Sequence, residues 1–438
     1  MRKRYLILRM ALFQLGFGLI SILVLGVLNR VMFAEIGLSA SLIGFLLAIP
    51  PLLSPLRLWL GYLSDRYSVL GYRRLPYILA GMVLAAGGVL GGTFGALAIP
   101  TALVPGIALA SVAFICYGMG KNAMATTFQA LIADVFNEAD RPRATSTLKA
   151  AFILGIVGGS VGLGRVIDPY SSTRLIAVVG GSGLVAVILS VIGCAGVEPR
   201  RQAGEAADPQ RRAGITFART MKLTFRNAQA RLFFLFIGAT LLATLSQDIF
   251  LEPYGATVFG MTVGETARLN VFWGIGTLSA LMLCGFWLVN RLGRRRVAAV
   301  GLVLVVLAFA SIVAAGVVQS RALFAVLVVL LGVGSGIAGA GALTLMVDFT
   351  TKEQAGLLMG AWTIAHQLAE VIGNFMGGIL VDSVFAQTGS YLTAFGTVFG
   401  LEILAALIGL GLLYRVNVSV FRTGQCRMEE ESLVPVAR

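Results

Sequence analysis

Long apolar runs separated by short polar segments recur along the whole chain. A helix that crosses a bilayer needs about 20 apolar residues, and runs of this length occur about twelve times. The expected spans are 10–32, 39–62, 76–98, 102–126, 148–167, 174–196, 231–256, 267–289, 298–318, 322–346, 356–381 and 391–414. This pattern predicts an all-α membrane protein.

A single long polar stretch divides these spans into two sets of six. It separates the sixth span from the seventh and is rich in arginine and proline. We therefore expect an N-terminal half over residues 1–197, a cytoplasmic linker over 198–230, a C-terminal half over 231–415 and a cytoplasmic tail over 416–438.

The composition excludes a water-soluble protein. Hydrophobic residues make up 58% of the chain and charged residues only 12%, whereas soluble domains carry about a quarter charged residues. The 54 glycines are typical of helices that approach one another closely in lipid.

The net charge of +14 would indicate nucleic acid in a soluble protein, but its placement indicates topology. Most of the 34 lysines and arginines lie in the N-terminus, the linker, the tail and alternate loops. The opposite side is expected to carry Arg30, Arg165, Arg174, Arg268 and Arg321. This asymmetry predicts a multi-pass protein of the bacterial inner membrane with both termini in the cytoplasm, in contact with anionic lipid and not with nucleic acid.

Two loops carry related motifs. Residues 61–66 read Gly-Tyr-Leu-Ser-Asp-Arg and are followed by Gly71 and a basic pair; residues 290–296 read Asn-Arg-Leu-Gly-Arg-Arg-Arg. Both resemble the loop signature of the major facilitator superfamily, which implies two pseudo-symmetric six-helix halves. We expect a cytoplasmic clamp between helices, formed by Asp65, Arg66, Arg73, Arg74, Asn290 and Arg291. Local charge neutralisation is the alternative interpretation of each copy.

Ionisable residues inside the expected spans are candidate functional groups, because each costs a few kcal/mol or more in the bilayer. Arg57 follows three prolines whose freed carbonyls it could satisfy. Lys121 lies late in the fourth span, from which its side chain could also extend to the cytoplasmic surface.

Asp248 and Glu252 lie one helical turn apart in the seventh span, and Tyr254 follows them. Residues at this spacing share a helix face, and we expect Pro253 to end or break the helix just beyond. The two carboxylates could titrate as a coupled pair or bind a ligand. Alternatively, the break lies near the surface and both acids are hydrated.

His366 is the only histidine, and Glu370 and Asn374 follow on the same helix face. Three roles stay open for it: a packed and hydrogen-bonded side chain, a proton relay with Glu370, or an axial ligand of a pigment magnesium. The chain has no second histidine that could complete a metal site, and it carries no catalytic motif. We expect no enzyme.

Two stretches resemble the PucC/LhaA family. They are residues 54–77, which begin Ser-Pro-Leu-Arg, and residues 247–255, which read Gln-Asp-Ile-Phe-Leu-Glu-Pro-Tyr-Gly. The resemblance implies a factor that assembles photosynthetic light-harvesting complexes, with antenna polypeptides and bacteriochlorophyll as partners and bacteriochlorophyll as a bound or transferred cofactor. An older label of the family, bacteriochlorophyll synthase chain, finds no support in these residues.

Two other functions remain alternatives. One is a proton-coupled secondary transporter of a small or amphipathic solute, favoured by the loop signatures and by the pair His366 and Glu370. The other is a structural subunit that stays bound to a photosynthetic complex.

Overall fold

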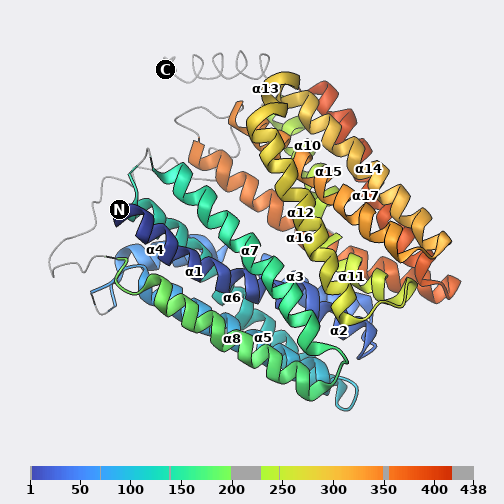
Figure 1. Cartoon of the computed structure of the whole chain (residues 1–438), viewed down its shortest axis with the longest axis horizontal. Coiled ribbons are helices and arrows are strands. Elements are labelled where there is room, and N and C mark those ends of the chain that lie inside the picture. The colour runs from blue at the N-terminus through green and yellow to red at the C-terminus, as the bar shows by residue number, and fades with distance from the viewer. Residues whose placement is uncertain are drawn as a thin grey trace, which may run out of the picture. The chain divides into compact units, whose positions relative to one another are not determined.

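The computed structural model describes residues 2–69, 71–137, 140–198, 228–245, 247–348 and 355–416. Helices dominate this part of the chain (Figure 1). They are α1 (Arg2–Ile22), η1 (Leu23–Leu28), α2 (Asn29–Ala34), α3 (Ala40–Leu52), α4 (Leu56–Arg66), α5 (Leu75–Ala98), α6 (Leu103–Val135), α7 (Arg141–Ile167), α8 (Ser172–Cys194), α10 (Ala228–Leu245), α11 (Gln247–Val258), α12 (Val263–Leu283), η3 (Cys284–Leu288), α13 (Val289–Leu292), α14 (Arg294–Val318), α15 (Arg321–Asp348), α16 (Ala355–Thr388) and α17 (Tyr391–Arg415).

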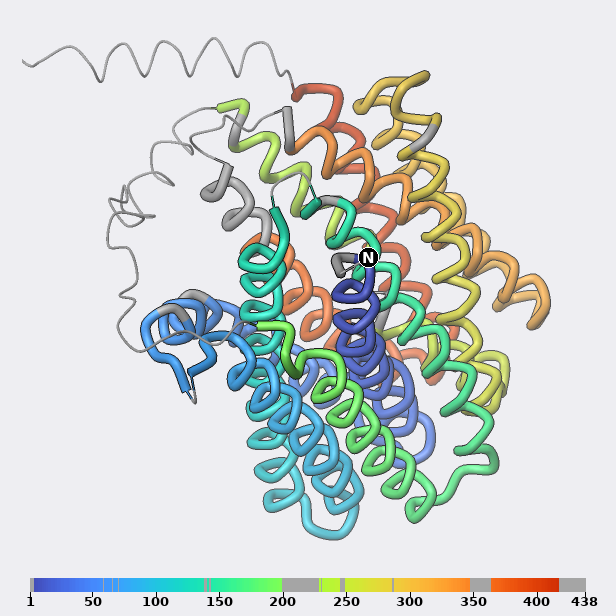
Figure 2. The backbone as a smooth tube through the Cα atoms, turned by 60° about the vertical axis from the view of Figure 1, so that its left-hand side comes forward, coloured from blue at the N-terminus to red at the C-terminus, as the bar shows by residue number. Residues whose placement is uncertain are grey.

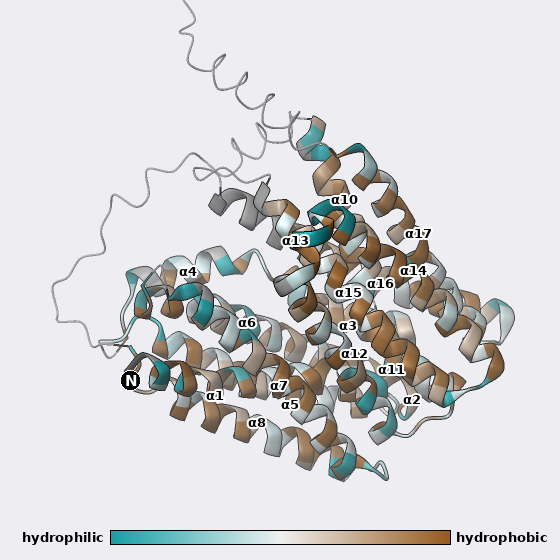
Figure 3. Ribbon diagram, turned by 45° about the horizontal axis from the view of Figure 1, so that its top comes forward, coloured by the Kyte–Doolittle hydropathy of each residue, from teal (hydrophilic) through white to brown (hydrophobic). Residues whose placement is uncertain are grey.

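The helices confirm the all-α membrane protein. Ten helices within the described residues are long and apolar enough to cross a bilayer, and hydrophobic residues predominate along the helices in Figure 3. Two of the twelve expected spans, 39–62 and 267–289, are not among them.

The span expected over 39–62 is divided by prolines. Pro50 and Pro51 lie inside α3, which ends at Leu52, and α4 starts after Pro55. Proline has no amide hydrogen and its ring clashes with the preceding turn. The apolar helix Ala40–Leu52 is therefore shorter than a full span.

The span expected over 267–289 is less apolar at its start. The first turns of α12 carry Glu265, Arg268 and Asn270. The helix continues into the π-helical segment η3. These charged and amide side chains lower the mean hydropathy of α12.

Packing divides the chain into two compact units. The first comprises residues up to α8, together with 247–274 and 374–395. In it, α1 packs along both α7 and α8, and α5 packs against α6 and α8 (Figure 2). Glycines allow these contacts: a Cβ atom at Gly88 would lie 2.5 Å from the amide nitrogen of Tyr117.

The second unit contains α10, the end of α12, η3, α13 to α15, the first part of α16 and most of α17. Its α14 and α15 pack along each other, because Gly301 and Gly341 leave no room for a side chain against the facing backbone. Phe309 and Phe399 stack at 5.4 Å between ring centroids.

The domain boundaries expected from the sequence stay predictions. Most of the expected linker, residues 199–227, and the tail from residue 417 lie outside the described residues.

Candidate functional site

Glu252 is a carboxylate buried inside a membrane span. It lies on α11 and is 2% exposed. The side-chain amide of Asn270 on α12 donates a hydrogen bond to Oε1, whereas Oε2 has no hydrogen-bond partner among the described residues. A buried carboxylate with an unsatisfied oxygen is costly, and such groups within membrane spans mark functional sites. Glu252 therefore defines the candidate site.

Glycine at position 26 makes room for this carboxylate. A Cβ atom on Gly26 would lie 2.6 Å from Oε1 of Glu252 and 2.9 Å from Cδ1 of Ile22. Gly26 belongs to η1, a π-helical turn between α1 and α2, and π-helical turns inside α-helices are frequent at functional sites. The backbone of the first span thus approaches Glu252 closely.

The expected break at Pro253 is wrong, because α11 continues through this residue to Val258. Proline cannot donate to the carbonyl of the residue four positions earlier, which is Ile249. The side-chain amide of Asn29 donates to that oxygen at 2.7 Å. A residue of α2 therefore supplies the hydrogen bond that α11 lacks, and the helix persists.

Arg30, expected on the side of the membrane opposite the basic loops, is a buried member of this site, and its side of the membrane stays a prediction. Its side chain is 4% exposed, forms an ion pair with Glu35 and donates to the carbonyl oxygen of Met261 at 3.0 Å. Its Nε has no hydrogen-bond partner in the described structure. The sequence pattern missed Arg30, Asn29 and Asn270 as members of this site, although the adjacent polar pair at 29 and 30 in an apolar run was a signal.

Tyr254 is an aromatic packing residue next to Glu252. It is fully buried, and its ring contacts Phe259 and Phe395 edge-to-face, with centroids 5.5 and 5.8 Å away. Phe33 of α2 also packs on Phe395. This aromatic cluster holds α11 against α2 and fixes the backbone that carries Glu252. The side chain of Asp248 lies outside the described residues, so its pairing with Glu252 stays a prediction.

Arg57 donates a hydrogen bond to Asn122, which in turn bonds a carbonyl of the proline-rich segment. Its Nε donates to Oδ1 of Asn122 at 2.6 Å. The amide nitrogen of Asn122 donates in turn to the carbonyl oxygens of Pro50, at 3.1 Å, and Gly118. Lys121 is the half-buried neighbour of Asn122 on α6, and its role stays a prediction.

Asn374 does for α3 what Asn29 does for α11: its side chain bonds a carbonyl that a proline leaves free. Its amide nitrogen donates at 3.3 Å to the carbonyl oxygen of Leu47, the oxygen that Pro51 leaves without a helical donor. Asp382, two turns later on α16, accepts from the amides of Ala40 and Ser41 at 2.9 and 2.7 Å.

His366 and Glu370 are both half-buried on α16. They belong to the second unit, whereas Asn374 belongs to the first. The three roles considered for His366 stay open. Within the described residues, no three His, Cys, Asp or Glu side chains form a group that could hold a metal ion.

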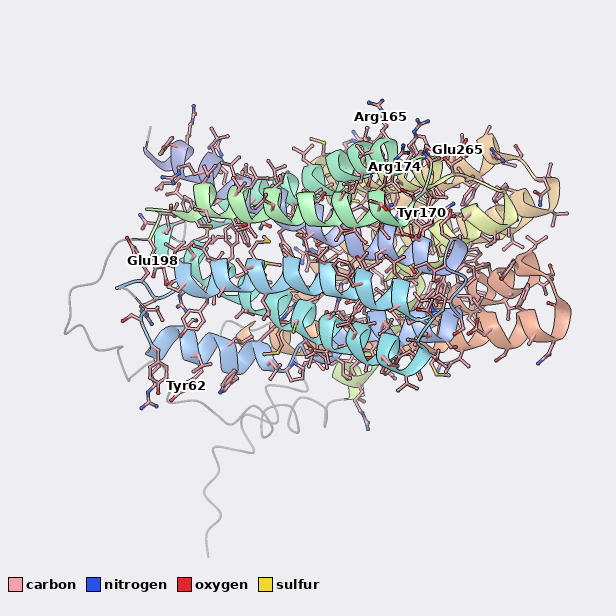
Figure 4. The ribbon with its side chains drawn as sticks, turned by 90° about the horizontal axis from the view of Figure 1, so that it is seen from below. Tyr62, Arg165, Tyr170, Arg174, Glu198 and Glu265 are labelled. Carbon is pink, nitrogen blue, oxygen red and sulfur yellow. The ribbon has the colours of Figure 1, made fainter. Side chains whose placement is uncertain are left out.

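The first loop motif forms a network around Arg74. The guanidinium of Arg74 is buried, pairs with Asp134 at 3.0 Å and donates to the hydroxyl of Ser64 at 2.7 Å. Glu198, labelled in Figure 4, accepts hydrogen bonds from the backbone amides of Arg73 and Leu75 at 2.7 and 2.8 Å. It thereby caps the start of α5. The side chain of Asp65 lies outside the description.

The remaining clamp residues make local contacts. Arg66 donates to the hydroxyl of Tyr62. In the second copy, Arg291 lies over the ring of Trp287 at 4.8 Å, and Asn290 is exposed on α13. A clamp that opens during a transport cycle stays a prediction.

Comparison with known proteins places this chain among relatives of similar length. The family described as PUCC protein matches residues 27–421. An uncharacterized protein from the puhA-bchM intergenic region of Rhodobacter capsulatus is 32% identical, over 88% of this chain and 82% of that protein. Protein PucC of Cereibacter sphaeroides is 31% identical, over 93% and 92%. The bacteriochlorophyll synthase 44.5 kDa chain of Rhodobacter capsulatus is 30% identical, over 93% and 95%.

Solved structures share the fold at low sequence identity. A bacterial homologue of the iron transporter ferroportin superposes with a TM-score of 0.70 at 14% identity, over 94% of this chain and 97% of that one. A bacterial homologue of the human lysosomal transporter Spinster gives 0.67 at 16% identity, over 96% and 97%. The D-xylose-proton symporter gives 0.68 at 15% identity, over 92% and 96%. These likenesses confirm the major facilitator fold.

Proposed function

This chain belongs to the PUCC protein family, and from this premise we propose that it is an assembly factor for light-harvesting antenna complexes, one that handles or delivers bacteriochlorophyll at the membrane. The observation that carries the proposal is the family match over residues 27–421. Relatives named PucC and bacteriochlorophyll synthase chain support a role in the photosynthetic apparatus. Its partners are antenna polypeptides and bacteriochlorophyll, which is bound or transferred without being chemically changed.

The buried site around Glu252 supports this proposal. The stretch over residues 247–255, which carries the family resemblance, forms most of α11. Glu252 within it offers an oxygen without a hydrogen-bond partner among the described residues. In the bilayer such an oxygen favours binding of a group that donates a hydrogen bond. A polypeptide or pigment in transit could supply that donor when the site becomes accessible.

The direct test is complementation of a strain that lacks the gene, with antenna absorbance as the readout. We expect Glu252→Gln and Asn270→Ala to restore much less antenna than the wild-type chain at equal protein level. His366→Ala should restore most of it, because loss of one hydrogen bond costs about 1 kcal/mol. Full restoration by both site variants, with failure of His366→Ala, would instead favour pigment ligation or a proton relay at His366.

A second candidate function is proton-coupled transport of a small or amphipathic solute. The shared fold with the D-xylose-proton symporter and other transporters favours it, as does an acidic side chain buried in a span. Two measurements separate the candidates. Copurified bacteriochlorophyll in the absorbance spectrum supports the assembly factor, whereas substrate-driven proton uptake into proteoliposomes, lost in Glu252→Gln, supports the transporter.

A further inference from the structure

An apolar groove lies between α7 and α8 of the first unit. Its volume is about 620 Å³. Leu15 and Leu19 of α1 line it together with glycines and aliphatic residues of α7 and α8. The two outer helices both pack along α1 but contact each other over a much shorter stretch. The groove is therefore the space between them, with α1 as its floor.

Glycines on α7 form two interleaved pairs, each with four-residue spacing. Gly155 and Gly159 are buried against α1: a Cβ atom on Gly155 would lie 2.4 Å from the carbonyl oxygen of Leu15. Gly158 and Gly162 are exposed and line the groove. A Cβ atom added at either position would meet no neighbouring atom within 4 Å. Such pairs let helix backbones approach closely in lipid. The pair Gly155 and Gly159 packs against α1. The pair Gly158 and Gly162 has the same spacing and faces the groove.

The opposite wall offers a hydrogen-bonding group. Ser182 of α8 lines the groove, is 8% exposed and makes no hydrogen bond in the described structure. Ser190 on the same helix, in contrast, donates to its own helix at 2.7 Å. Gly181 beside Ser182 is exposed and open. A free hydroxyl in an apolar membrane groove suits a backbone carbonyl of another helix, because serine side chains bond across helices in membranes.

Positive charge lies at one end of the groove. Arg165 follows the glycine pair on α7 and adjoins the lining residue Val166; Arg174 lies one turn before the lining residue Ala177 on α8. Both side chains are exposed, and Figure 4 shows that Arg165 projects away from the helix. This end favours a partner with acidic groups where its helix leaves the bilayer.

We propose that this groove docks one transmembrane helix of an antenna polypeptide, with small residues four positions apart facing Gly158 and Gly162 and an acidic group near Arg165. The identity of the partner rests on the proposed function, whereas the helix-binding geometry does not. Acyl chains of lipid would fill any apolar groove. Only a helix uses the glycine spacing, the hydroxyl of Ser182 and the charged end together.

Photo-crosslinking in native membranes tests the proposal. A benzophenone amino acid replaces Val185, which lines the groove and is 47% exposed, or, as the matched control, Leu407 of α17, which is 49% exposed. We expect an adduct at position 185 that mass spectrometry identifies as the transmembrane segment of an antenna polypeptide, and none at 407. Adducts only to lipid, no adduct, or equal adducts at both positions would overturn the proposal.

Filling the groove should abolish docking. Gly158→Leu is expected to lower the adduct at position 185 about tenfold, the factor that corresponds to about 1.4 kcal/mol of lost association energy. Gly411→Leu on α17, also exposed and open, is the control and should leave the adduct unchanged. Gly181→Leu fills the groove from the other wall and replaces Gly158→Leu if that variant does not fold. An adduct that persists in both groove variants contradicts docking.

The same strains keep the two proposals distinguishable. If the strain without the gene still builds normal antenna, the proposed function fails. If antenna assembly requires this chain but tolerates both groove variants, only the docking inference fails.

Discussion

The side-chain amide of Asn29 supplies the hydrogen bond that Pro253, which has no amide hydrogen, cannot donate within α11. Asn29 donates to the carbonyl oxygen of Ile249 at 2.7 Å, inside the first unit. Asn374 does the same for the carbonyl that Pro51 leaves free in α3. These helices therefore keep proline within the membrane because a neighbouring helix supplies the missing donor.

A double-mutant cycle tests the pairing of Asn29 with Pro253. Asn29→Ala leaves a buried carbonyl unsatisfied and should lower the free energy of unfolding by about 1–3 kcal/mol. In the Pro253→Ala background, α11 has its own amide donor, so Asn29→Ala should cost much less. Thermal or denaturant unfolding of the detergent-solubilised protein measures the coupling. Strictly additive effects would show that the two residues do not act together.

Gly26→Ala should disturb the carboxylate of Glu252 directly. The added Cβ would lie 2.6 Å from Oε1, so the carboxylate or the helix must shift, and overpacking of this kind costs about 1–3 kcal/mol. We expect reduced antenna assembly in the complementation assay. Gly400→Ala, at an exposed position with open space, is the control and should change stability by less than about 0.5 kcal/mol. Equal behaviour of the two variants would remove Gly26 from the site.

Glu198→Ala should loosen the start of α5. The carboxylate accepts from the amides of Arg73, Arg74 and Leu75, and loss of a helix cap typically costs about 1 kcal/mol. Glu198→Gln keeps one acceptor oxygen but loses its charge near the helix N-terminus, so it should cost less than Glu198→Ala. Melting temperatures of the purified variants give this order, and an inverted order would argue against capping.

The expected orientation in the membrane is tested with reporter fusions. Reporters inserted between residues 199 and 227, or placed after residue 416, should both report the cytoplasm, because the basic segments flank the same ends of the spans. A periplasmic signal from either position would change the number of spans by one.

The fold could be predicted from the sequence because the length of an apolar run and the charge of a loop depend only on neighbouring residues. The positions of most spans needed only a count of consecutive apolar residues, and Glu252 stood out as an acid within one of them. The two expected spans that are not among the ten long apolar helices differ for local reasons too: prolines divide one, and early polar residues lower the hydropathy of the other.

The rest of the site depends on partners that are distant in the sequence. Asn29 was not expected to matter, because its partner carbonyl lies 220 residues further along. The continuation of α11 through Pro253 could not be predicted without that partner. Similarly, nothing local marks Gly26 as the residue that faces the carboxylate.

These distant partners also impose an order on biosynthesis. The first span reaches the membrane early, but the carbonyl that Asn29 bonds is made 220 residues later, roughly 10 to 45 s at ordinary rates of translation. The last segment of the first unit, residues 374–395, is made later still. Until these partners are made, the carbonyl of Leu47 lacks the donor from Asn374, and Asn29 has, of its described partners, only the carbonyl of Leu25 within its own span. In the nascent chain, polar groups of the early helices therefore lack their final hydrogen-bond partners until the last spans have been inserted.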